Sequence, residues 1–188
     1  RQQIDAALDT LVSWKWNTVI VPLDGENVGE AFHPAAYLTQ RARERELFVY
    51  GVLDLHVGEE DGAEPTVFAE RVALWNDILQ TAKAYDMDGY LLANYSYAYQ
   101  QAPLLRGYAA GMIDQLLRQA TALLRAENPN WYIGLLTNAV WAHRSVDAHG
   151  SETASVYEEY TDGCADTRTL VLDGAVDFVM VQAYASTS

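Results

Sequence analysis

Hydrophobic and polar positions follow two alternating patterns along the whole chain. Apolar residues at helical spacing predict five helices, and a short continuous apolar run after each helix predicts five strands. The predicted helices cover residues 2–14, 34–46, 65–84, 103–126 and 155–172. The predicted strands cover residues 17–23, 47–53, 89–95, 131–137 and 176–184. Units in this order are typical of a parallel sheet, and the continuous apolar runs indicate strands covered on both faces.

Polar and aromatic side chains follow the predicted strands at their carboxyl ends. Aspartates follow the first two strands, and amides and aromatic residues follow the later ones. A (β/α)8 TIM barrel builds its site from polar residues at the carboxyl ends of several parallel strands. A whole barrel takes about 250 residues, so the 188 residues of this chain predict an incomplete barrel. A flavodoxin-like five-stranded parallel sheet is the alternative, and it fits the length.

The composition indicates a single α/β domain over residues 1–188 and excludes several classes of partner. Lys+Arg 12 against Asp+Glu 26 gives a net charge of −14. Nucleic acids and anionic lipids are bound through an excess of Lys and Arg, so neither is expected as the main partner. No apolar run approaches the roughly 20 residues that cross a bilayer, so no membrane-spanning segment is predicted.

Cofactor and metal patterns are missing from the sequence, so neither kind of group is predicted. The phosphate-binding patterns G-x-G-x-x-G and G-x-x-x-x-G-K do not occur. The single cysteine, Cys164, excludes an intrachain disulfide and a cysteine-based zinc site. Its place in the last predicted helix indicates a buried structural thiol. His143 and His149 are spaced unlike the ligands of the standard metal motifs.

Four segments together carry a resemblance to a known family. Residues 17–21 read Asn-Thr-Val-Ile-Val, residues 94–97 read Asn-Tyr-Ser-Tyr, and residues 138–141 read Asn-Ala-Val-Trp. The fourth segment, residues 165–184, is the most specific. Together they resemble glycoside hydrolase-like family ten, bacterial TIM-barrel proteins associated with extracellular or cell-wall glycans. The resemblance implies that residues 1–188 hold about strands two to six of the barrel, that the ligand is a carbohydrate, and that the location is extracellular or the cell surface.

Departures from the family pattern bear on catalysis. The family carries an acidic pair near the end of its fourth strand, and this chain has Ala93 and Asn94 there. Asp24 stands where the family tends to have arginine, and Asp54 stands where asparagine is usual. The loss of the acidic pair leaves two hypotheses open. Either the barrel binds and hydrolyses a glycan, or it is a non-catalytic carbohydrate-binding or surface-scaffold protein derived from such a hydrolase.

Glycoside hydrolysis usually needs two carboxyl groups on either side of the scissile bond. Asp54 and Asp24 are the catalytic candidates, because neighbouring strands would present them to one barrel mouth. The run from Asp24 to Asn27 also has the composition of a simple turn.

Sugar contacts are predicted from amide and aromatic side chains at the strand ends, since aromatic faces pack on sugar rings and amides bind hydroxyls. These substrate-binding candidates are Asn94, Tyr95, Tyr97, Asn138, Trp141, Gln182 and Tyr184. For the aromatic residues, packing at the barrel end is the alternative. The remaining tryptophans, Trp14, Trp16, Trp75 and Trp131, are predicted to be packing residues.

Overall fold

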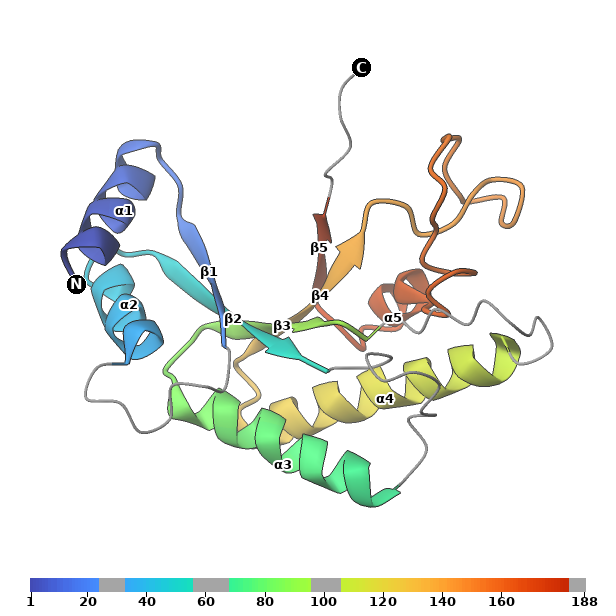
Figure 1. Ribbon diagram of the computed structural model, residues 1–188, viewed down its shortest axis with the longest axis horizontal. Coiled ribbons are helices and arrows are strands. Elements are labelled where there is room, and N and C mark those ends of the chain that lie inside the picture. The colour runs from blue at the N-terminus through green and yellow to red at the C-terminus, as the bar shows by residue number, and fades with distance from the viewer. Residues whose placement is uncertain (24–32, 56–67, 96–105, 183–188) are drawn as a thin grey trace.

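The computed structural model of the chain describes residues 1–23, 33–55, 68–95 and 106–182 (Figure 1). Asp24, Tyr97 and Tyr184, three of the candidate site residues, lie outside these ranges. The helices are α1 (Gln2–Ser13), α2 (Pro34–Arg43), α3 (Phe68–Ala84), α4 (Arg106–Glu127) and α5 (Thr167–Leu172). The strands are β1 (Thr18–Pro22), β2 (Phe48–Asp54), β3 (Gly89–Ala93), β4 (Tyr132–Asn138) and β5 (Phe178–Gln182). No helix within the described ranges is both long and apolar enough to cross a membrane.

The strand order decides between the two predicted architectures. All four pairings are parallel, and the order is β1-β2-β3-β4-β5. A flavodoxin-like sheet has the order 2-1-3-4-5, which reverses direction at a switch point. The sequential order therefore confirms the incomplete TIM barrel. Figure 1 shows the strands turning steadily from β1 to β5, with α3 and α4 side by side against one face of the curled sheet.

Two glycines on the inner face of the sheet allow this curvature. The rings of Tyr50 on β2 and Phe178 on β5 are 5.4 Å apart, although two strands lie between them in the sheet. A Cβ atom on Gly134, the register partner of Phe178, would come within 2.6 Å of the Phe178 ring. A Cβ atom on Gly89 would lie 2.0 Å from the carbonyl oxygen of Tyr132. Gly134 thus makes room for the Phe178 ring, and Gly89 permits the close approach of the β3 and β4 backbones.

The hydrophobic core lies between the other face of the sheet and the helices. The alternate strand residues Val49, Leu53, Leu92 and Leu135 are buried there with Leu8, Leu117 and Leu124 from the helices. This arrangement explains the continuous apolar runs, because the inner face also carries apolar residues such as Leu91, which is fully buried. Val179 and Val181 on β5, in contrast, are 39% and 49% exposed.

A repeated hydrogen-bond pattern fixes the amino ends of the strands. Asp88 stands just before β3, and its carboxylate accepts the backbone N–H of Val49 at 2.7 Å. Asp177 stands just before β5, and its carboxylate accepts the backbone N–H of Ile133 at 2.8 Å. Each aspartate also donates its own backbone N–H to the carbonyl of the same partner, at 2.9 and 2.8 Å. These aspartates align the start of one strand with the strand before it.

The last predicted helix is wrong over residues 155–166, which are not helical in the structure. The prediction was residues 155–172, whereas α5 covers Thr167–Leu172. Asp166 is the helix N-cap, and its carboxylate accepts the backbone N–H of Thr169 at 3.1 Å. Cys164 is buried as predicted, but it precedes the helix and has a left-handed backbone with φ 52°. Local side-chain bonds to the backbone compete with helix formation here: Ser155 Oγ bonds to Tyr157, and the Asp162 carboxylate accepts the N–H of Glu158 at 2.9 Å.

The tryptophans differ from their prediction at two positions. Trp75 and Trp131 pack against the core as predicted. Trp14 and Trp16, which follow α1, are 65% and 61% exposed, so they do not pack in the described part of the molecule.

Candidate functional site

The carboxyl ends of β2, β4 and β5 place three of the candidate residues on the inner face of the curled sheet. In a parallel sheet, register partners point to the same face, and residues two apart along a strand do so as well. By this alternation, the pairs Asp54↔Ala93 and Asn138↔Gln182 lie on the same face as Tyr50 and Phe178. Asp54, Asn138 and Gln182 therefore line the inner side of the barrel end, which we call the mouth.

Asp54 and Asn94 are in direct contact at the mouth. The side-chain amide of Asn94 donates a hydrogen bond to the Asp54 carboxylate. Asn94 follows β3 directly and has φ 51°, a left-handed conformation that asparagine tolerates better than most residues. This backbone turn brings its side chain towards β2. The structure thus joins the leading catalytic candidate to a substrate-binding candidate.

Asn138 and Gln182 form the second polar group of the mouth, as side-by-side residues of the paired strands β4 and β5. The Asn138 side chain is exposed and that of Gln182 is half-buried. The backbone N–H of Asn138 donates to Glu159 Oε2 at 3.0 Å, which fixes the backbone at the end of β4. Both side chains carry donors and acceptors, which is what binding to sugar hydroxyls requires.

Trp141 lies three residues beyond Asn138 and is held on several sides. Its indole N–H donates to Asp166 Oδ1 at 3.2 Å. The Tyr160 ring meets it edge-on, with centroids 5.5 Å apart, and the Arg168 guanidinium lies 5.4 Å from its ring centroid. The half-buried indole is therefore fixed in orientation, and Arg168 occupies part of one face.

Tyr95 is placed differently from its prediction as a sugar contact. Its side chain is 1% exposed, so the ring packs in the interior, which was the alternative for the aromatic run. Burial raises the pKa of Tyr95, and the nearby Glu159 carboxylate raises it further. The hydroxyl makes no hydrogen bond of normal geometry to a described residue. Tyr95 thus stays neutral beneath the mouth.

Glu158 and Glu159 were missed by the sequence analysis, which placed residues 155–172 in a helix and named neither glutamate as a candidate. They are 2% and 1% exposed. Glu159 binds Asn138, and Glu158 accepts hydrogen bonds from the backbone N–H of His143 and from the Thr161 hydroxyl. Gly163 and the capping residue Asp166 were the sequence signals that the helix begins later.

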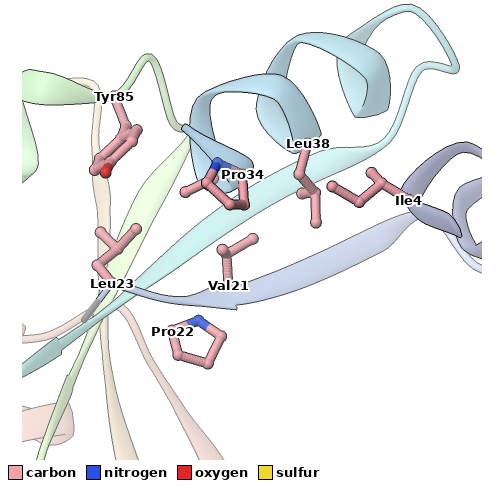
Figure 2. A pocket seen from close by; sticks show the side chains of 8 residues that line it. Ile4, Val21, Pro22, Leu23, Pro34, Leu38 and Tyr85 are labelled. Carbon is pink, nitrogen blue, oxygen red and sulfur yellow. The ribbon is translucent and has the colours of Figure 1, made fainter. Parts of the chain in front are cut away.

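Two further features of the described residues are separate from the mouth. No three His, Cys, Asp or Glu side chains among them gather as a metal site, and His149 pairs with Asp147 at 3.0 Å. A cavity of about 270 Å³ lies between β1, α1 and α2 (Figure 2). It is lined by Ile4, Val21, Pro22, Leu23, Pro34, Ala35, Leu38 and Tyr85. This almost wholly apolar lining lacks the hydrogen-bonding groups that a sugar needs.

The fold and mouth define the class as an incomplete TIM barrel with a polar site at the carboxyl ends of its strands. No family model matches the chain. The sequence is similar to the glycosyl hydrolase YngK of Bacillus subtilis, with 29% identity over 127 residues. That match covers 58% of this chain and 25% of the relative, so the chain corresponds to about a quarter of the relative's length.

Solved glycosidase structures share the fold. A chitinase from Chromobacterium violaceum superposes with a TM-score of 0.62 at 12% identity, covering 97% of this chain and 53% of the chitinase. An endo-1,4-beta-mannanase from Rhizomucor miehei superposes with a TM-score of 0.63 at 9% identity, covering 97% of this chain and 63% of the mannanase. The chain therefore has a barrel fold found in glycosidases and is similar in sequence to a glycosyl hydrolase.

Proposed function

We propose that this chain is part of a glycoside hydrolase-like barrel of family ten that binds a glycan at its mouth. The observation that carries the proposal is the Asp54–Asn94 contact on the inner face of the strand ends. This is the end of the barrel at which TIM-barrel enzymes hold their substrates. The similarity to a glycosyl hydrolase makes a carbohydrate the best-supported ligand class.

The side chains at the mouth are suited to a polyhydroxylated ligand. Asn94, Asn138 and Gln182 supply amide donors and acceptors, and Trp141 supplies a fixed aromatic surface. The glycan is proposed to be extracellular or part of a cell wall, as the family resemblance implies, with the protein outside the cell or on its surface.

Hydrolysis requires a second carboxyl group in addition to Asp54. The two groups would lie about 5–5.5 Å apart in a retaining enzyme or about 6.5–9.5 Å apart in an inverting one. Glu159 does not fill this role, because its buried carboxylate is bound to the backbone of Asn138. Asp24 is the partner that we propose from this chain, with Tyr97 and Tyr184 as further sugar contacts.

Non-catalytic carbohydrate binding is the second candidate function, and Asn94 favours it. The amide of Asn94 occupies the position at which the family pattern has an acid, and it is bound to Asp54. An amide cannot donate a proton to a leaving group as a carboxylic acid does. A barrel with Asn94 in this place would keep the glycan but not cleave it.

Binding and hydrolysis of defined oligosaccharides separate the two candidates. Hexasaccharides of chitin, mannan and cellulose are titrated into the protein by calorimetry, and product formation is followed by chromatography. Asp54→Asn is compared with Asp86→Asn, which changes an 85% exposed aspartate before β3, at the other end of the strands.

An enzyme is expected to lose at least about 100-fold of its hydrolysis rate in Asp54→Asn and none in Asp86→Asn. A binding protein is expected to release no product, and its affinity is expected to fall in Asp54→Asn alone. The proposal fails if no hexasaccharide binds, or if both variants behave as the wild type does.

A further inference from the structure

Two adjacent glutamates between β4 and α5 hold both ends of one short segment. Glu159 accepts the backbone N–H of Asn138 at 3.0 Å, and Glu158 accepts the backbone N–H of His143. The held segment, residues 138–143, contains both Asn138 and Trp141. We call Glu158 and Glu159 the glutamate clamp.

Backbone hydrogen bonds fix the middle of the same segment. The N–H of Glu159 donates to the carbonyl of Val140 at 2.9 Å, and the N–H of Tyr160 donates to the carbonyl of Trp141 at 2.8 Å. The carboxylates take the N–H groups at the two ends, that of Asn138 at the last residue of β4 and that of His143 beyond the strand. A buried N–H without an acceptor costs free energy, so an irregular buried segment needs side-chain acceptors of this kind.

The clamp also lies near the other half of the mouth. Tyr95, which directly follows Asn94, has its buried hydroxyl beside the Glu159 carboxylate, and Glu159 raises the pKa of this phenol. Glu159 is therefore bound at the end of β4, which carries Asn138, and is near the residue that follows Asn94. A displacement of Glu159 would therefore affect the surroundings of both Asn138 and Tyr95.

We propose that Glu158 and Glu159 are positioning residues of the glycan site. They hold residues 138–143 so that Asn138 and Trp141 meet the same ligand. The part of this inference that concerns the glycan rests on the proposed function, whereas the holding of the segment does not. Neither glutamate touches the ligand, because both are buried beneath the segment that they bind.

The test compares removal of the acceptor with removal of the charge. Glu159→Met and Glu158→Met keep most of the side-chain volume but lose both acceptor oxygens. Glu159→Gln and Glu158→Gln keep one acceptor oxygen and lose the charge. Glu152→Gln is the matched control, because Glu152 lies in the same connection but is 75% exposed and paired with Arg144.

Two readouts are taken well below the unfolding temperature of each variant. Amide hydrogen exchange is measured by mass spectrometry on peptides covering residues 138–143. Affinity is measured for whichever of chitohexaose, mannohexaose and cellohexaose the wild type binds most tightly. We expect exchange in the segment to accelerate about tenfold or more in the methionine variants, with affinity about tenfold weaker. The glutamine variants should recover both values to within about twofold, and Glu152→Gln should match the wild type.

Different failures have different meanings. Faster exchange with unchanged affinity in both methionine variants would overturn the positioning role. Equal losses in the glutamine and methionine variants would overturn the acceptor role. A wild type that binds none of the three hexasaccharides would overturn the proposed function and the role of the clamp in it, while the exchange data would still decide whether the clamp holds the segment. If one methionine variant does not fold, the other is sufficient for the test, because Glu159 and Glu158 bind opposite ends of residues 138–143.

Discussion

The aspartates that flank the strands act differently at the two ends of this barrel. At the amino ends of the strands, Asp88 and Asp177 each bind the backbone N–H of the neighbouring strand. At the carboxyl ends, Asp54 is bound by the side-chain amide of Asn94. A carboxylate that binds a strand backbone is part of the sheet, whereas one that binds a surface amide can exchange that partner for a ligand hydroxyl. The aspartates at the amino ends are thus structural, and we propose the role in glycan binding for Asp54 at the carboxyl end.

Aromatic residues give a second contrast between the two ends. Phe48 and Tyr132, at the starts of β2 and β4, are 51% and 56% exposed. Trp141 at the mouth is half-buried and fixed by Asp166, Tyr160 and Arg168. A fixed ring loses little conformational entropy when a sugar stacks on it, so Trp141 is the aromatic residue that we propose as the sugar surface.

The largest effect is expected from removing an aspartate at the amino end. Asp177→Ala leaves the buried N–H of Ile133 without its acceptor and breaks the ion pair with Arg125. The free energy of unfolding should fall by about 2 kcal/mol, as measured by urea denaturation, because hydrogen bonds to charged groups contribute roughly 1.5–3 kcal/mol. Asp177→Asn, which keeps one acceptor oxygen, should lose less. An unchanged free energy of unfolding in Asp177→Ala would contradict the structural role.

Alkaline pH should destabilise the protein through the tyrosine beneath the mouth. Burial raises the pKa of Tyr95 above its ordinary value near 10. The folded state therefore keeps the proton that the unfolded state releases. The stabilising contribution is present below about pH 10 and is lost as the pH rises beyond it, by at most about 1.4 kcal/mol per pH unit. Tyr95→Phe should make the urea midpoint fall less steeply between pH 9 and 11 than it does in the wild type; equal slopes would contradict this assignment.

A smaller effect separates the aromatic residues at the two ends. Trp141→Leu is expected to weaken hexasaccharide binding about fivefold, whereas Tyr132→Ser should change it by less than about twofold. Calorimetric titration measures both, and unfolding temperatures confirm that each variant is folded. A greater loss in Tyr132→Ser would move the site to the amino end of the barrel.

The fold was largely predictable from the sequence, because hydrophobic periodicity marks long elements well. The run 103–126 has an apolar stripe, and α4 covers Arg106–Glu127. The prediction failed at residues 155–166, where helical spacing of apolar residues coincides with an irregular, partly buried segment. The glutamates of that segment bind backbone N–H groups distant in the sequence, which local periodicity cannot indicate.

The site was predicted as a set of positions rather than as contacts. Strand ends identified Asp54, Asn94, Asn138 and Gln182, since parallel strands bring their carboxyl ends together. The left-handed turn at Asn94 and the burial of Tyr95 depend on tertiary packing, so the sequence did not distinguish these neighbours. The glutamate clamp could not be predicted either, because its contacts also depend on tertiary packing.

A titration of the isotope-labelled protein by nuclear magnetic resonance, with the hexasaccharide that binds most tightly, tests the central claim most directly. The amide signals that shift are expected to belong to the strand carboxyl ends, with Asp54, Asn94, Asn138 and Trp141 among them. Signals of Phe48, Asp88 and Tyr132 should stay in place. Shifts confined to those amino-end residues, or an absence of any shift at saturating hexasaccharide, would contradict it.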